Sequence, residues 1–261
     1  MNLSDYVLNF LVKKKIKDVF LITGGAISFM VDAFSRNKKI KYTCVAHEQS
    51  AAMMADAYSR LGPNLSCTMV TSGPGATNLV TGIADAQIDS TPIVCITGQV
   101  PSHLLGSDAF QETDIVGIST PVTKWNHQVT KASQIPEIIA RAFYIAKSGR
   151  PGPVLIDITK DAQFEEFDFQ YKKCTGVRSY VPVPKTDDSS VTAAAELINS
   201  AKKPLIIWGQ GIILSKAELE LKALVEKAGI PAAWTIMGAS ALPTSHPLNI
   251  GMVGMHGNYA P

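Results

Sequence analysis

Long apolar runs and strong net charge are both missing from this 261-residue sequence. No apolar run approaches the ~20 residues that cross a bilayer, and the amino terminus shows no signal-peptide pattern, so we expect a cytoplasmic protein without a membrane partner. The formal net charge is only +2, which gives no reason to expect nucleic acid or an anionic membrane surface as a partner. Partners must therefore be inferred from sites.

Cysteine is scarce too, with four residues in the chain, and no pair has the spacing of metal ligands. Cys44, Cys67 and Cys95 lie in apolar, strand-like runs, and Cys174 lies in a linker-like stretch. We therefore predict buried, reduced thiols, which suit a cytoplasmic protein in which disulfides are unusual.

The sequence does contain a regular alternation of strand-like and helix-like segments. The predicted strands are 19–22, 40–46, 65–71, 92–97 and 153–158, and the predicted helices include 48–61, 76–88 and 133–147. Alternating units of this length favour an α/β fold, with a doubly wound parallel sheet covered on both faces. We assign residues 1–163 to this domain.

Between residues 164 and 188 the pattern changes to acidic, aromatic and proline-rich sequence, which is typical of an interdomain linker. Residues 189–261 then show helices at 190–201 and 215–228 and strands at 204–208 and 231–236. About seventy residues make only half of a doubly wound domain, so we expect a truncated, Rossmann-like second domain. The chain would then be a fragment, a split subunit or a truncated product.

Two turns carry residues that suggest chemistry. Glu48 ends a strand-like run and begins a helix-like run, although an acidic residue is favoured in the first turn of any helix. The segment Thr71-Ser-Gly-Pro-Gly-Ala-Thr-Asn78 joins a second strand to a second helix. Its glycines and proline let the backbone approach a ligand, with free N–H groups at the helix start.

Both turns belong to a set of segments whose order and spacing resemble the thiamine-diphosphate-dependent enzymes, in particular the large subunit of acetolactate synthase. The matching segments include Gly24-Gly-Ala26, His47-Glu-Gln49, Thr71 through Asn78, Ile96-Thr-Gly-Gln-Val100, Asp108-Ala-Phe-Gln-Glu112, Ser148-Gly-Arg-Pro-Gly-Pro153 and Asp157-Ile-Thr-Lys-Asp161. Together they span nearly the whole chain. The resemblance implies a pyrimidine-binding domain followed by part of a central domain.

The resemblance also implies roles for particular residues. Glu48 would bind the N1′ atom of the cofactor's aminopyrimidine and drive it to the imino tautomer, and Gln111 would lie near the reacting centre. The remaining implied positions are cofactor contacts at Ile22, Thr71, Pro74 and Asn78, a substrate pocket and entrance at Gly25, Ala26, Phe110 and Lys160, and FAD contacts at Arg150, Met255, His256 and Gly257.

Several of these residues also have a purely structural explanation. Thr71 and Asn78 suit a turn and a helix cap, Phe110 suits a hydrophobic core, and Arg150 and Lys160 suit solvated positions that flank a strand. Ile22 departs from the family, which has tyrosine there, and can offer only apolar packing. This departure bears on which substrate is used more than on whether the cofactor binds.

The family's Gly-Asp-Gly segment, which binds Mg²⁺ and the diphosphate, is absent from this sequence. We therefore name no metal ligand in this chain and expect Mg²⁺ to be held by residues outside it. Because the family builds its active site between two subunits, the resemblance implies a homodimer or homotetramer. Whether FAD binds and whether a regulatory subunit associates are left open.

Three functions fit this pattern. The first is a carboligase like acetolactate synthase, which decarboxylates pyruvate and joins the two-carbon unit to a second 2-keto acid. The second is a related decarboxylase or carboligase for another 2-keto acid or a keto sugar, and the third is a non-catalytic, truncated subunit. A dinucleotide-binding Rossmann protein fits poorly, because the turn at Gly24-Gly25 lacks the third spaced glycine.

Overall fold

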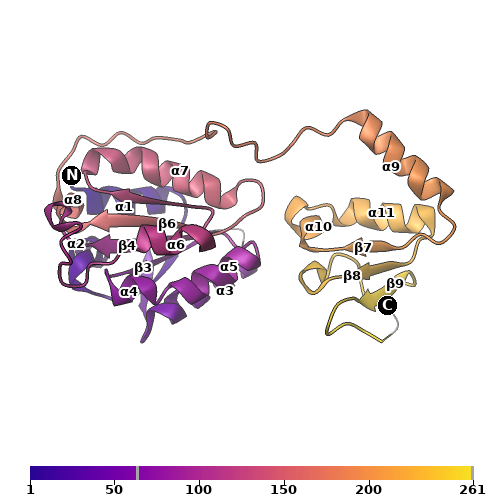
Figure 1. Cartoon of the computed structure of the whole chain (residues 1–261), viewed down its shortest axis with the longest axis horizontal. Helices are drawn as coiled ribbons and strands as arrows, with labels where there is room; N and C mark the ends of the chain where they lie inside the picture. Colours follow the sequence, from indigo (N-terminus) through magenta and orange to yellow (C-terminus); the bar gives the residue numbers. More distant parts are fainter. Residues whose placement is uncertain (63–64, 260–261) are drawn as a thin grey trace. The chain divides into compact units, whose positions relative to one another are not determined.

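The computed structural model describes residues 1–62 and 65–259, which divide into two compact units (Figure 1). The first unit extends to Val183, and the second begins at Pro184. Each has its own sheet and its own hydrophobic core. No helix in the described ranges is both long enough and apolar enough to cross a membrane.

The first unit is built on a six-stranded sheet in which every pairing is parallel. Its strands are β1 (Asp18–Leu21), β2 (Lys41–Cys44), β3 (Ser66–Val70), β4 (Ile93–Gln99), β5 (Trp125–Val129) and β6 (Val154–Thr159), in the order β2-β1-β3-β4-β6-β5. The predicted doubly wound α/β fold is confirmed. The strand order reverses between β1 and β3, and ligands bind at the carboxyl ends of strands at such a switch point.

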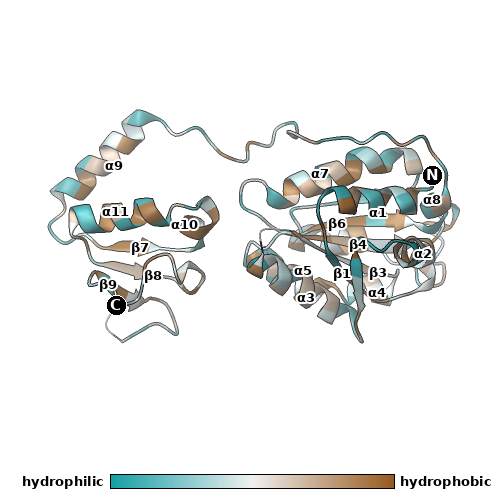
Figure 2. Cartoon of the chain, turned by 180° about the vertical axis from the view of Figure 1, so that it is seen from behind, coloured by the Kyte–Doolittle hydropathy of each residue, from teal (hydrophilic) through white to brown (hydrophobic). Residues whose placement is uncertain are grey.

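Helices cover both faces of this sheet (Figure 1). On one face α1 (Leu3–Lys13), α2 (Ser28–Arg36) and α7 (Ile135–Lys147) pack over a core that includes Leu11 and Phe34, both at most 1% exposed. The other face carries α3 (Glu48–Leu61), α5 (Val80–Ile88) and α6 (Ile115–Ser119). Apolar residues concentrate in the strands between these layers (Figure 2), as expected when both faces are covered.

The predicted helix 48–61 is found with the same bounds, whereas the predicted helix 76–88 is divided. Its first turn belongs to α4 (Pro74–Thr77), and α5 starts only at Val80. Proline at the first helical position suits a helix start because its missing N–H has no partner there. The divided helix leaves Asn78 at the end of α4.

The prediction of buried thiols is wrong for Cys44, which is exposed, and correct for Cys67 and Cys95. Cys44 ends β2, an edge strand whose residues are mostly exposed, whereas β3 and β4 are central strands buried on both faces. The apolar run at 40–46 therefore does not indicate burial of all its residues, because β2 is an edge strand with a neighbouring strand on one side.

Arg60 connects α3, which carries Glu48, to α5. Its guanidinium lies 2.7 Å from the Asp56 carboxylate one turn earlier and 2.8 Å from Asp89 at the end of α5. The Arg60–Asp89 ion pair therefore joins α5 to the end of α3 that lies opposite Glu48.

Residues 165–180 belong to the first unit and pack against α1. The backbone N–H of Leu3 donates to the Glu165 carbonyl, the Tyr6 and Phe169 rings stack with centroids 4.6 Å apart, and Phe10 and Tyr171 stack at 5.6 Å. A short helix, α8 (Lys160–Phe164), precedes this segment and packs against the 3₁₀ turn Gly25–Ile27.

The second unit has a three-stranded parallel sheet, β7 (Ile206–Trp208), β8 (Ala232–Trp234) and β9 (Asn249–Met252), in that order. Helices α10 (Gln210–Ser215) and α11 (Glu218–Ala228) pack on it, and the Trp208 indole N–H donates to the Gly238 carbonyl at 2.9 Å. Helix α9 (Asp188–Ser200) has no buried residue.

Candidate functional site

The candidate site lies at the carboxyl ends of β1, β2 and β3, where the strand order reverses. Ile22 directly follows β1, and its N–H donates to the Met69 carbonyl of β3 at 3.2 Å. Glu48 begins α3 after β2, and Thr71 follows β3. Parallel strands bring their carboxyl ends to one edge of a sheet, so the topology places these three predicted residues together.

Glu48 and Asn78, thirty residues apart, are in direct contact. The Asn78 side-chain amide donates to Glu48 Oε2 at 2.9 Å. His47 caps the helix, because its Nδ1 accepts from the Gln49 N–H at 3.1 Å, and so the Glu48 carboxylate is not used as the cap. Glu48 Oε1 has no hydrogen-bond partner among the described residues, and the residue is only half-buried. One oxygen is thus fixed and the other can accept a further donor.

Two glycines let the backbone close around Thr71. A Cβ on Gly24 would lie 2.4 Å from Thr71 Cβ, and one on Gly75 would lie 2.7 Å from Thr71 Cγ2 and 3.3 Å from Glu48 Oε1. Thr71 Oγ1 also accepts from the Ala26 N–H at 3.3 Å. Both glycines are therefore required by close approach to Thr71, and Gly75 also leaves the Glu48 carboxylate free of a neighbouring side chain.

The loop that carries Gln111 lies against the same turn. Gly73 has φ +58°, and a Cβ there would lie 2.7 Å from the Gln111 carbonyl oxygen. Gln111 itself has φ +60°, an unusual conformation for a residue with a side chain. The structure thus brings Gln111 to the turn from Thr71 to Asn78 and holds its backbone in a strained conformation, which such residues keep only when their surroundings enforce it.

Glu112 organises this loop, a role that the sequence does not reveal. Its carboxylate accepts from the Ala109 N–H at 2.9 Å and from the Gly106 N–H. These backbone donors, with Gly106 first, lower the pKa of the Glu112 carboxyl. Phe110, at the tip, is 88% exposed, so its explanation as a core residue is wrong.

A buried hydrogen-bond network around a carboxylate behind the site is a second feature that the sequence does not reveal. Asp157 on β6 accepts from the Thr97 hydroxyl at 2.7 Å, from the Gln128 amide at 2.9 Å and from the Gln99 amide at 3.2 Å. Burial raises the pKa of Asp157 to about 6, and the three hydrogen bonds oppose that rise. The available signal was a lone acidic residue inside the apolar run 154–158.

Gln99 connects this network to the loop. Its amide also donates to the Thr113 carbonyl at 2.9 Å, two residues after Gln111. The position of the loop is therefore coupled to hydrogen bonds in the interior of the sheet.

The chain matches two family models. Residues 1–118 match "Thiamine pyrophosphate enzyme, N-terminal TPP binding domain", and residues 191–261 match "Thiamine pyrophosphate enzyme, central domain". The chain belongs to the thiamine pyrophosphate enzymes.

Several relatives of this chain are named acetolactate synthases. It is 43% identical over 254 residues to the acetolactate synthase isozyme 1 large subunit of Escherichia coli, covering 97% of this chain and 44% of the relative. The large subunit of Corynebacterium glutamicum is 47% identical over 239 residues (92% and 38%), and a probable large subunit of Methanococcus aeolicus is 44% identical over 260 residues (98% and 43%). The chain therefore spans less than half the length of these relatives.

The Glu48 carboxylate fits the aminopyrimidine ring of the cofactor. Its oxygen without a partner among the described residues matches a ring nitrogen that carries a proton. Pro74 begins α4 and is exposed. The roles of Thr71, Pro74, Asn78 and Ile22 toward the cofactor stay predictions.

The entrance residues lie at the same edge of the sheet. Ala26 accepts from the Gln163 amide at 2.6 Å, and nothing lies within 4 Å of the position of a Cβ on Gly25, so Gly25 faces open space. Lys160 begins α8 directly after β6 and is half-buried. Their contacts with a substrate remain predictions, as does that of Phe110.

Arg150 has structural partners in the first unit. Its guanidinium donates to Ser90 Oγ at 2.6 Å and to the Ile88 carbonyl at 2.9 Å, at the carboxyl end of α5. Cations stabilise such helix ends. A contact with FAD is a further role that no observation tests.

In the second unit, His256 and Gly257 line a cavity of about 680 Å³ with Trp234 and Met252 at the carboxyl ends of β8 and β9. Met255 does not line it and is 95% exposed. Within residues 1–62 and 65–259, no three His, Cys, Asp or Glu side chains gather in a way that could hold a metal ion.

Proposed function

We propose that this chain is the pyrimidine-binding part of a thiamine-diphosphate-dependent carboligase similar to acetolactate synthase. The enzyme would decarboxylate pyruvate and join the two-carbon unit to a second 2-keto acid. The hydrogen bond of 2.9 Å between Asn78 and Glu48 carries this proposal, because it orients a carboxylate whose other oxygen is available at the switch point of the sheet.

Glu48 would hold a proton at the ring nitrogen through Oε1, while Asn78 fixes Oε2 and so prevents the carboxylate from rotating away. When bound, thiamine diphosphate supplies the carbanion stabilisation that the decarboxylation of a 2-keto acid requires. A positioned carboxylate that exchanges a proton in this way contributes typically 10²- to 10⁴-fold to rate.

The loop with Gln111 would complete the site from the substrate side. Its backbone is fixed against Gly73 and by the hydrogen bonds of Glu112, so the Gln111 side chain is presented from a defined position. Phe110, exposed in this chain, would be covered by the reacting substrate or by a second subunit and would exclude water there. Lys160 and Gly25 would line the way in.

The remainder of the active enzyme would come from outside the described residues. Mg²⁺ and the diphosphate would be held by a carboxyl-terminal domain of a second subunit, so we propose a homodimer or homotetramer. FAD would occupy the cavity of about 680 Å³ beside His256 and Gly257, and a regulatory subunit would associate with the assembled enzyme.

A fusion of this chain to the carboxyl-terminal residues of the Corynebacterium glutamicum relative tests the proposal. With thiamine diphosphate and Mg²⁺, we expect acetolactate to form from pyruvate, and we expect Glu48→Gln in the same fusion to lower turnover by about 10²-fold or more. Turnover of pyruvate to another product would favour a related decarboxylase instead. An assembled fusion in which Glu48→Gln has no effect would refute the assignment.

A further inference from the structure

A cavity at the opposite edge of the first sheet is lined by two lysines. It has a volume of about 310 Å³ and lies between the carboxyl ends of α1 and α7. Its apolar wall includes Ile16 and Leu65, which precede β1 and β3, so it is at the amino ends of these strands. The candidate catalytic site lies at their carboxyl ends, about 15 Å away along the strands.

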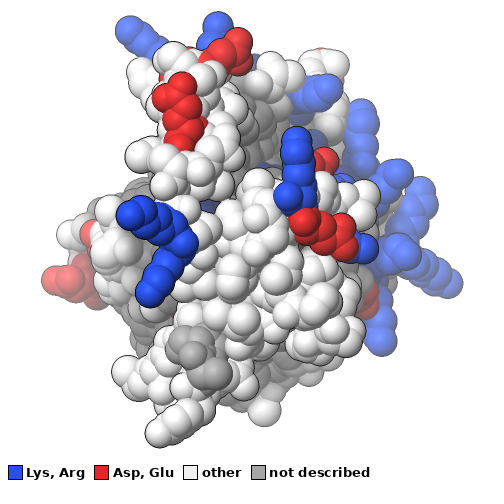
Figure 3. All heavy atoms as spheres, turned by 90° about the vertical axis from the view of Figure 1, so that its right-hand side faces the viewer, with Lys and Arg blue, Asp and Glu red and all other residues white. Residues whose placement is uncertain are grey.

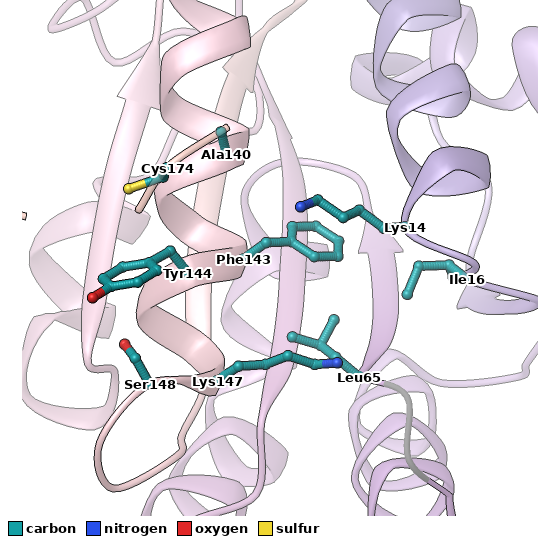
Figure 4. Close-up of a pocket in the computed structure, with 9 residues that line it drawn as sticks. All are labelled: Lys14, Ile16, Leu65, Ala140, Phe143, Tyr144, Lys147, Ser148 and Cys174. Atoms are coloured by element: carbon teal, nitrogen blue, oxygen red, sulfur yellow. The ribbon is translucent and has the colours of Figure 1, made fainter. Parts of the chain in front are cut away.

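Figure 4 shows Lys14 and Lys147 entering the cavity from different sides, Lys14 ending beside the Phe143 ring and Lys147 ending beside Leu65. No carboxylate of the described residues lies within ion-pair distance of either ammonium group, and no acidic residue lines the cavity. The two cations thus face the same space without an anionic partner from the described chain.

The ordinary explanation for lysines at these positions is that they neutralise the dipoles at the helix ends. At the end of α7, however, another residue already does so. The Lys124 ammonium donates to the Ile145 carbonyl and, at 2.8 Å, to the Ser148 carbonyl. Lys147 is therefore not needed as a cap, and its ammonium group is left for another partner.

The electrostatics of the pair support this conclusion. Partial burial and then the nearby charge of Lys14 lower the pKa of Lys147. Among the described residues Lys14 has aromatic partners, with its ammonium 5.2 Å from the Phe10 ring centroid and 5.9 Å from that of Tyr171. Lys13, Lys15 and Lys17 beside it are exposed, and Figure 3 shows basic side chains gathered along one edge of the fainter part of the chain.

The wall of the cavity indicates what kind of anion fits. Ile16, Leu65 and Phe143 are each at most 7% exposed and supply an apolar surface. Ser148 also lines the cavity, and its hydroxyl donates to the Tyr180 hydroxyl at 3.4 Å. An apolar wall with a few convergent polar groups is typical of small-molecule sites. An amino acid would place its own ammonium against two lysines, whereas a simple carboxylate would not.

We propose that this cavity binds a small monocarboxylate with a short aliphatic chain, the carboxylate lying between Lys14 and Lys147 and the chain against Ile16, Leu65 and Phe143. The site is separate from the candidate catalytic site and does not depend on the proposed function. A ligand bound there would act on the first unit as an effector, because it stabilises the folded state that holds α1 and α7 together.

Hexanoate is a suitable probe, with hexanamide as its neutral counterpart and inorganic phosphate as an anion without an apolar chain. For the 261-residue chain we expect saturable binding of hexanoate by calorimetry with a dissociation constant of about 1 mM. We expect hexanamide and phosphate to bind at least about tenfold more weakly. Equal binding of hexanamide, tighter binding of phosphate, or no saturable binding of hexanoate would overturn the proposal.

Single substitutions test where hexanoate binds. Lys14→Gln and Lys147→Gln should each weaken hexanoate binding about tenfold, whereas Lys17→Gln, a change at an exposed lysine that does not line the cavity, should leave it unchanged. Glu48→Gln should also leave it unchanged, which separates this site from the candidate catalytic site. Equal losses of hexanoate affinity in Lys17→Gln and Lys147→Gln would show nonspecific attraction. A loss of affinity in Glu48→Gln would show that hexanoate binds at the other edge of the sheet. Either result contradicts the assignment.

Discussion

The amide of Asn78 lies 2.9 Å from Glu48 Oε2, so the end of α4 orients the first residue of α3. This relationship separates the structural role of Glu48 from its proposed chemical role. Glutamine at position 48 can still accept the Asn78 amide through its own oxygen, whereas alanine at position 78 removes the donor.

We therefore expect Glu48→Gln to change the free energy of unfolding by less than about 0.5 kcal/mol, and Asn78→Ala to lower it by about 1 kcal/mol. Urea denaturation of the 261-residue chain measures both. The interpretation of Glu48 as a residue held for chemistry would be wrong if Glu48→Gln proved the more destabilising change.

Alanine substitutions at the neighbouring residues Gly24 and Gly25 should affect stability differently. A Cβ at Gly24 would overlap Thr71, so Gly24→Ala should cost about 1 to 3 kcal/mol in stability, whereas nothing lies within 4 Å of a Cβ at Gly25. Gly25→Ala is the matched control and should change stability by less than about 0.5 kcal/mol. Thermal unfolding of both variants checks the difference, and equal melting temperatures would contradict the close packing at Thr71.

Asp157 should make stability depend on pH. Because burial raises its pKa from 3.8 to about 6, the folded state binds the proton more tightly than the unfolded state. This group therefore favours the folded state below pH 3.8, and its contribution is lost as pH rises to about 6, a change of about 3 kcal/mol.

Asp157→Asn should remove this dependence between pH 4 and 6, because asparagine stays neutral and its oxygen can still accept from Gln99 and Gln128. Urea titrations at several pH values measure the effect. An unchanged pH profile in the variant would assign the dependence to other groups.

The Glu112 carboxylate should control the mobility of the loop that carries Gln111. Glu112→Gln leaves one acceptor oxygen where the carboxylate offers two, so one of the N–H groups of Gly106 and Ala109 loses its partner. We expect faster amide exchange over residues 105–112 with little change in the core strands. In the wild-type chain the same loosening should appear as pH falls, because the pKa of Glu112 is lowered in the folded state.

Thiol labelling should distinguish the cysteines. Cys44 is exposed and should react quickly, whereas Cys67 and Cys95 are fully buried and their burial raises the pKa of both thiols. We expect Cys67 and Cys95 to react only in denaturant. Rapid labelling of Cys67 in the native chain would show that β3 opens locally.

Much of the first unit could be predicted because its strands and helices have distinct periods. The helix 48–61 is delimited by an acidic first residue and a following glycine, and the structure has the same bounds. The edge strand β5 could not be predicted, since Trp125–Val129 is half-buried and polar and resembles a loop. The exposure of β2 could not be predicted either, because an apolar run does not indicate which strand lies at the edge of the sheet.

In the candidate site, the sequence identified residues by type but not by contact. The pairing of Glu48 with Asn78 depends on the order of β2, β1 and β3, which local patterns do not encode. Asp157 and Glu112 were overlooked because each stands alone among residues that suggest packing or a turn. The partners of Asp157 come from two neighbouring strands and those of Glu112 from a loop backbone, so both sets appear only after folding.

The aromatic residues after α8 have a practical consequence for anyone who isolates the first unit. Phe169 stacks on Tyr6 and Tyr171 on Phe10, so a protein truncated after Gln163 would expose these rings on α1 to water and tend to self-associate. A boundary after Val183 retains their cover and should yield a monodisperse product.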